Sequence, residues 1–144
     1  MLAAVSADRL GMFEWKPEYG VGIEMVDSQH QQLFAIGREL YAAMSSGKGT
    51  ATVGNILDRL IQYTKSHFAA EEALQRKAGY PNYLNHKKKH DELTKQVLEF
   101  QAEFAAGRVA LSIQVLEFLR TWLTQHIQVE DTAYAPYVKS KAVA

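Results

Sequence analysis

The chain contains no cysteine, and this absence removes several kinds of chemistry at once. Without thiols there can be no disulfides, thiolate metal ligands, iron–sulfur clusters or cysteine nucleophile. Any metal that the chain holds must therefore be bound by nitrogen and oxygen atoms.

The sequence also lacks an excess of charge of either sign, since 16 Lys and Arg oppose 16 Asp and Glu. Long-range attraction to a polyanion is therefore missing, and neither nucleic acid nor a membrane is expected as a partner. No apolar run approaches the roughly 20 residues that span a bilayer. Residues 1–13 include Asp8 and Arg9 and lack the apolar stretch of a signal peptide, which favours a cytoplasmic protein.

Strand-like alternation is absent too, whereas apolar residues recur at helical spacing in four segments bounded by Gly or Pro. The segments cover about residues 27–46, 52–78, 82–106 and 112–137. Their short connections predict an all-α, antiparallel up-down-up-down four-helix bundle at residues 25–140, with residues 1–24 as an extended N-terminal arm packed on it. Asp27 or Ser28 is expected to cap the first helix, Gly79 to end the second in a left-handed conformation, and Pro136 to kink or end the fourth.

The chain has five histidines, and each falls on the apolar face of a predicted helix. One buried histidine needs a single hydrogen-bond partner, as in many protein cores. Five histidines that face one interior would leave several ring nitrogens without a hydrogen-bond partner, at a cost of about 1–3 kcal/mol each. A metal shared by these histidines would accept their lone pairs and remove that cost. The distribution of histidines therefore predicts a metal site in the bundle core.

Carboxylates stand at helical spacing from these histidines. Glu71 lies four residues after His67, and His126 is followed by Glu130 and Asp131. Imidazole with carboxylate is typical of iron, zinc, copper or nickel sites, and five nitrogens exceed the needs of one tetrahedral zinc. Two octahedral ions that share two carboxylates and a solvent oxygen would use about eleven of twelve positions, which leaves one open. Same-face geometry favours Glu130 over Asp131 as the second acid.

Several motifs together make the chain similar to a known family. They are the segment VGIEMVDSQH at 21–30, the pair His67 and Glu71, the pair His86 and His90, and the segment WLTQHIQVED at 122–131 followed by Tyr134. In these motifs, their order and their number, the chain resembles the hemerythrins, in particular the single-domain bacterial hemerythrins. The resemblance covers nearly the whole chain.

The resemblance implies a centre of two iron ions bridged by an oxo or hydroxo group. Three imidazoles would hold one iron ion: those of His86, His90 and His126. Two would hold the other, those of His30 and His67, and the bridging carboxylates would be those of Glu71 and Asp131. Oxygen would bind at the iron held by His30 and His67.

The function that the resemblance implies is reversible binding of molecular oxygen by a carrier, store or delivery protein that is not an enzyme. The residues expected to line a dry oxygen pocket are Phe34, Leu60, Phe68, Leu93, Leu119 and Ile127. Glu72 is a candidate hydrogen-bond partner for a ligand imidazole. Trp122 and Tyr134 are interpreted as core residues rather than gates, and Lys87 to Lys89 as a solvated face.

Other functions stay open at this stage. A ferritin-like di-iron oxidase uses Glu-x-x-His pairs, and the sequence contains none. An oxygen or redox sensor acting in trans, an iron buffer and a weak peroxidase-type activity are compatible with the same donor set.

Overall fold

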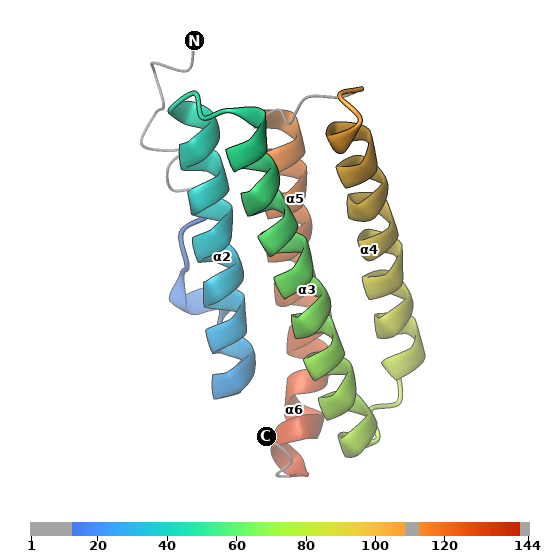
Figure 1. Ribbon diagram of the computed structural model, residues 1–144. Helices are drawn as coiled ribbons and strands as arrows, with labels where there is room; N and C mark the ends of the chain where they lie inside the picture. The colour runs from blue at the N-terminus through green and yellow to red at the C-terminus, as the bar shows by residue number, and fades with distance from the viewer. Residues whose placement is uncertain (1–12, 109–112, 142–144) are drawn as a thin grey trace.

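The computed structural model describes residues 13–108 and 113–141, and these form long helices that lie side by side (Figure 1). The helices are α2 (Glu24–Ser45), α3 (Thr50–Ala78) and α4 (Tyr83–Ala105), followed by a fourth rod. That rod consists of α5 (Ile113–Gln125), the π-helical turn η3 (His126–Asp131) and α6 (Thr132–Ser140). The described residues contain no strand, so the predicted all-α four-helix bundle is confirmed. The predicted start of the fourth segment at residue 112 lies outside the described residues.

The second helix ends at a glycine, as the sequence predicts. Gly79 follows α3 with φ of 68°, a left-handed conformation that carries little steric cost without a side chain. The next backbone N–H, that of Tyr80, then donates to the carbonyl of Gln75 at 3.0 Å. This bond satisfies a carbonyl that the helix end would otherwise leave free.

The expected cap of the first helix is wrong. The helix α2 begins at Glu24, and no side chain caps it. The carboxylate of Asp27 instead accepts backbone N–H bonds from Val21 at 2.8 Å and Gly22 at 3.2 Å. Gly22 has a φ of 80°, and this turn directs both N–H groups of the arm toward the first turn of α2. Asp27 therefore fixes the entry of the arm instead of capping the helix.

The fourth rod does not end at Pro136, because α6 continues through this residue to Ser140. Proline removes one backbone donor, but its helix neighbours Tyr134, Ala135 and Val138 are buried in the core. Tertiary packing of that face outweighs the lost hydrogen bond.

Two apolar clusters fill the bundle, one on each side of a buried polar layer. One cluster includes Leu40, Leu57 and Leu116, and the other includes Val26 and Tyr134. On α3, for example, His67 lies between Ile61 of the first cluster and Leu74 of the second. No helix among the described residues has both the length and the apolar character that crossing a membrane requires.

The described part of the N-terminal arm lies against α2. The ring of Phe13 packs edge-on against Phe34, with ring centroids 6.5 Å apart, and the carbonyl of Phe13 accepts a bond from the Arg38 guanidinium at 2.6 Å. Beneath the ring lies Gly37, where a Cβ atom would come within 2.5 Å of Phe13 Cδ1. The arm docks this closely because residue 37 has no side chain.

This close approach gives a prediction about two helical glycines. Replacing Gly37 by Ala should destabilise the protein by about 1–3 kcal/mol, because the added methyl group overlaps the Phe13 ring. The matched change Gly54→Ala in α3 adds a methyl group 3.4 Å from Phe104, an ordinary contact, and should be neutral or stabilising by up to about 1 kcal/mol. Urea unfolding of both variants measures their free energies of unfolding. A loss of stability of similar size in both variants would contradict the prediction.

Candidate metal centre

All five imidazoles and two carboxylates converge in the buried layer between the apolar clusters. Each side chain is at most 5% exposed, and Glu71 and Asp131 are fully buried. Every rod contributes: α2 gives His30, α3 gives His67 and Glu71, α4 gives His86 and His90, and η3 gives His126 and Asp131.

Three imidazoles form one group around the Asp131 carboxylate. The Nε2 atom of His90 lies 3.1 Å from that of His86 and 3.0 Å from that of His126. Asp131 Oδ1 lies 3.2 Å from the Nε2 atoms of both His86 and His126. Metal–nitrogen bonds of about 2.1 Å place neighbouring octahedral ligands about 3.0 Å apart. The three nitrogens therefore have the mutual spacing of ligands on one cation.

The other two imidazoles form a second group. The rings of His30 and His67 have centroids 4.6 Å apart, and His67 Nε2 lies 3.6 Å from Glu71 Oε1. His30 Nε2 lies 3.8 Å from Glu71 Oε2 and 3.2 Å from Asp131 Oδ2. Asp131 thus presents one oxygen to each group. Glu71 Oε1 also lies 3.2 Å from His90 Nε2, so both carboxylates stand between the two groups.

The π-helical turn explains how Asp131 reaches the cluster. In an α-helix a residue five positions after His126 points about 140° away from it, which is why simple helix geometry favours Glu130. The turn η3 runs from His126 to Asp131, and its i to i+5 bonding accommodates one extra residue. Asp131 therefore faces the same interior as His126. The carboxylate of Glu130 instead forms an ion pair with Lys89 and stands apart from the cluster.

Several buried polar atoms of the cluster lie near other donor atoms but form no hydrogen bond within the described part of the chain. They include His30 Nε2, Glu71 Oε1 and both carboxylate oxygens of Asp131. Buried donors and acceptors are normally satisfied, and a buried carboxylate without compensation is especially unfavourable. Cations bound between the imidazoles and carboxylates would satisfy these atoms. The residues present therefore fit a metal centre of nitrogen and oxygen donors.

Two polar side chains orient imidazoles from outside the cluster. His67 Nδ1 donates to Gln29 Oε1 at 2.7 Å, and His90 Nδ1 donates to Glu72 Oε2 at 2.8 Å. Each bond fixes the proton on Nδ1 and leaves the Nε2 lone pair free for a cation. Glu72 was a candidate for this contact from its sequence position, whereas Gln29 was missed because a glutamine beside His30 gives no recognisable signal.

The sequence predicts Tyr134 as a core residue, and in the structure it is buried but also forms a hydrogen bond with the cluster. Its ring is fully buried, and its hydroxyl donates to Glu71 Oε2 at 2.7 Å. Burial and the nearby carboxylates raise the pKa of Tyr134, so the hydroxyl stays protonated and keeps donating. Tyr134 therefore holds the Glu71 carboxylate in place.

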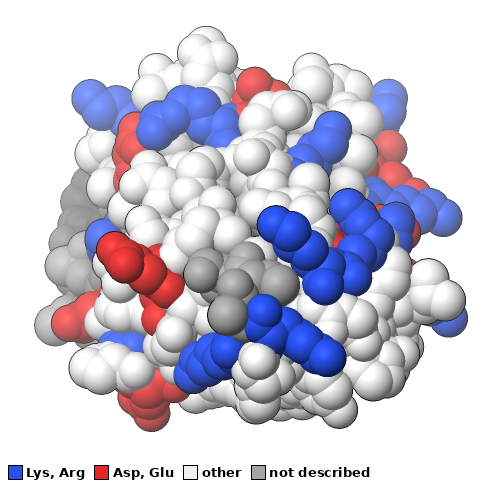
Figure 2. All heavy atoms as spheres, turned by 90° about the horizontal axis from the view of Figure 1, so that it is seen from below, with Lys and Arg blue, Asp and Glu red and all other residues white. Residues whose placement is uncertain are grey.

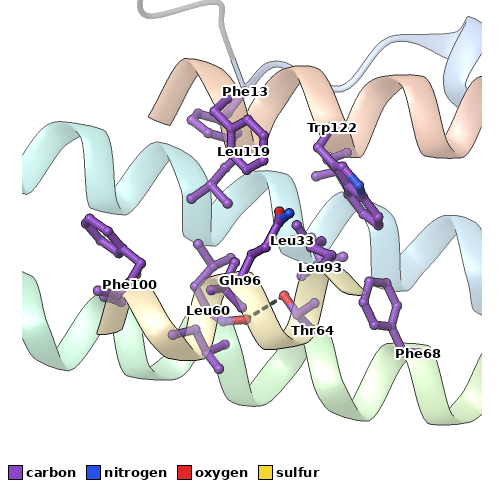
Figure 3. A pocket seen from close by; sticks show the side chains of 15 residues that line it. Phe13, Leu33, Leu60, Thr64, Phe68, Leu93, Gln96, Phe100, Leu119 and Trp122 are labelled. Carbon is purple, nitrogen blue, oxygen red and sulfur yellow. Dashed lines mark hydrogen bonds between the residues drawn. The ribbon is translucent and has the colours of Figure 1, made fainter. Parts of the chain in front are cut away.

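An apolar cavity of about 340 Å³ adjoins the cluster (Figure 3). Four of the predicted pocket residues line it: Leu60, Phe68, Leu93 and Leu119. The other two, Phe34 and Ile127, do not line this cavity and pack in the same core cluster as Tyr134. Trp122, interpreted as core, is half-buried and lines the cavity.

Charged side chains of both signs lie at the surface near the cluster. Lys87 Nζ bonds Asp91 at 2.7 Å at an exposed position. Figure 2 shows the end of the bundle at which α6 finishes, and acidic and basic side chains both occur there.

Without a cation, the buried carboxylates hold protons on some imidazoles. Burial disfavours the charged form of His86, but the carboxylates of Asp131 and Glu71 outweigh it and raise the His86 pKa to about 9. Burial lowers the pKa of His67 to about 4, so this ring is neutral at pH 7. Burial also opposes ionisation of Asp131, yet the neighbouring imidazoles hold the pKa of this carboxyl well below its usual range.

Comparison with known families gives a match over most of the chain. The model of the hemerythrin HHE cation binding domain matches residues 21–138. A protein named bacteriohemerythrin from Stenotrophomonas maltophilia is 36% identical over 131 residues, covering 91% of this chain and 84% of its own length. Bacteriohemerythrin from Methylococcus capsulatus is 33% identical over 119 residues, covering 83% of this chain and 90% of its own.

Comparison with solved structures agrees. The crystal structure of a wild-type hemerythrin superimposes with a TM-score of 0.82 at 32% sequence identity. The match covers 86% of this chain and 95% of that one. Sequence and structure thus point to the same family.

The position of Asp131 predicts opposite outcomes for two neighbouring acids. Asp131→Asn should lower the metal content of both groups, because its two oxygens lie 3.2 Å from imidazoles of each. Glu130→Ala removes only the ion pair with Lys89 and should keep the metal content within experimental error of the unchanged protein. Elemental analysis after identical metal loading measures both. Loss of metal from the Glu130 variant with retention in the Asp131 variant would refute the assignment.

The raised pKa of His86 predicts that metal binding releases protons. At pH 7 this imidazole is protonated in the metal-free protein, and a cation can bind Nε2 only after the proton leaves. Loading with Co²⁺ at pH 7 should release at least one proton per chain, and affinity should rise with pH up to about 9, the pKa of His86. An indicator dye in weak buffer and titrations from pH 6.5 to 8.5 test this. Affinity independent of pH would contradict it.

Proposed function

Because the chain belongs to the hemerythrin family, a family with a cation-binding domain, we propose that it binds molecular oxygen reversibly at a non-haem di-iron centre. Its role would be that of an oxygen carrier, store or delivery protein. The cytoplasm remains the predicted location, and the protein acceptor of the oxygen is unassigned.

One observation carries the proposal, namely the division of the donors into two groups that share two carboxylates. His86, His90 and His126 would hold one iron ion, and His30 and His67 the other. Glu71 and Asp131 would bridge the ions, together with an oxo or hydroxo group. The spacing of 3.0 to 3.8 Å between these nitrogens and oxygens supports such a sharing of ligands.

The unequal division supports a ligand site on one side only. The group with three imidazoles offers one nitrogen more than the group of His30 and His67. If both ions take the same number of ligands, the ion held by two imidazoles keeps an open position. Oxygen would bind there, since a reduced iron pair supplies the electrons for reversible oxygen binding.

The surrounding residues of the chain would protect and orient this centre. Tyr134 donates to Glu71, and Gln29 and Glu72 accept from imidazoles, so the donors are fixed before a cation arrives. Phe68 stacks on His90 with ring centroids 3.7 Å apart, and Trp122 stacks on His126 at 4.5 Å. These rings exclude water and ions from the side that faces the apolar cavity.

The donor set supports a carrier better than an oxidase. Two carboxylates among five imidazoles place less negative charge on the metals than a carboxylate-rich oxidase site would, and a strongly oxidising iron is then harder to reach. An oxygen or redox sensor acting in trans, an iron buffer and a peroxidase-type side activity are the alternatives to the proposal.

The proposal predicts a colour change that can be reversed. The purified protein should hold two iron ions per chain, be nearly colourless when reduced without air, and gain a visible charge-transfer band on exposure to oxygen. Flushing with argon should remove the band over repeated cycles, as measured by absorption spectroscopy.

Irreversible oxidation at the first exposure would contradict the carrier proposal and favour an oxidase. Iron that is released on oxidation or reduction would favour a buffer. His67→Ala, which removes a donor from the two-imidazole group, should abolish the reversible band, whereas Lys88→Ala on the exposed face serves as the matched control.

A further inference from the structure

The apolar cavity beside the cluster is larger than a diatomic gas requires. Its volume is about 340 Å³, whereas an apolar protein cavity of about 150 Å³ already takes up benzene. Pockets that bind small organic molecules begin at about 300 Å³. The cavity therefore has the size of an organic ligand site.

The cavity arises where two rods separate. The helix α4 packs on α3, and no comparable backbone packing joins α4 to α5 within the described part of the chain. Side chains from both helices border the space between them, among them Leu93 and Phe100 of α4 and Leu119 and Trp122 of α5 (Figure 3). Phe118, which is 49% exposed, lies at the edge open to solvent.

The lining defines the chemistry of an occupant. No charged side chain lines the cavity among the described residues, and its two polar side chains are those of Thr64 and Gln96. The Thr64 hydroxyl already donates to the Leu60 carbonyl at 2.7 Å. Five of the fifteen lining residues carry aromatic rings, among them Phe68, Phe100 and Trp122, and such rings favour offset or edge-on contact with another ring. A charged ligand would lose its hydration there without compensation.

We propose that this cavity is a binding site for an uncharged, single-ring aromatic molecule. Such a molecule would fill apolar space between α3, α4 and α5 that no side chain of the lining occupies. An empty apolar cavity costs stability in proportion to its volume, and a ligand that binds the folded state alone stabilises it. The proposal concerns binding of an organic molecule and is independent of whether the protein binds oxygen.

The site adjoins the metal centre through two ring pairs. Phe68 and Trp122 line the cavity and at the same time stack on His90 and His126. A bound ring would contact the outer side of these pairs. Occupancy would therefore reach the environment of two candidate metal ligands without contact with a cation.

Toluene is a suitable probe, and benzoate is its charged control of similar size. Calorimetry on the metal-loaded protein under nitrogen should show one saturable toluene site per chain, and saturating toluene should raise the melting temperature. Benzoate should produce neither effect. The absence of saturable binding, or equal binding of benzoate, would overturn the proposal.

Two variants of equal added bulk locate the site. Leu119→Trp fills the cavity and should weaken toluene binding at least tenfold, whereas Leu98→Trp adds the same ring at an exposed position of α4 outside the lining and should leave it unchanged. If Leu119→Trp does not fold, Val97→Phe fills the cavity from α4 instead. Equal binding by the filled and control variants would overturn the proposal.

Discussion

Two carboxylates buried without exposure in an apolar bundle are the constraint on which the rest of the structure depends. Glu71 and Asp131 lie between two apolar clusters, where an isolated charge is strongly disfavoured. The five imidazoles converge on them from four rods, and Tyr134 donates to one of them. The helices are thus held at separations that these contacts allow, and the apolar clusters on either side exclude the water that would otherwise solvate the charge.

Much of this arrangement could be predicted from the sequence, because the pattern of residues is periodic. Apolar residues at helical spacing predicted four helices, and the predicted ends lie within a few residues of the observed ones. The exception is the start of the fourth helix, which lies outside the described residues. The same periodicity placed every histidine on an inward face. Helix geometry then brings His67 to Glu71 and His86 to His90 without knowledge of the tertiary fold.

The features that sequence reasoning missed depend on local departures from ideal geometry or on contacts between elements. Simple helix geometry favoured Glu130, and Asp131 was expected as a ligand only because of the family resemblance. The π-helical turn accounts for its inward position. Gln29 and Asp27 form contacts across elements that no spacing rule encodes. The cavity between α4 and α5 depends on how far these two rods separate, so the spacing of apolar residues did not predict which of them line it.

The π-helical turn also divides the fourth rod into two α-helical pieces, α5 and α6, that differ in helical register. Before His126 the inward face follows one α-helical register, and after Asp131 the register is displaced by the extra residue of the turn. The helical register thus changes at this turn. Transplanting the rod into another bundle would require moving both halves together with the turn that joins them.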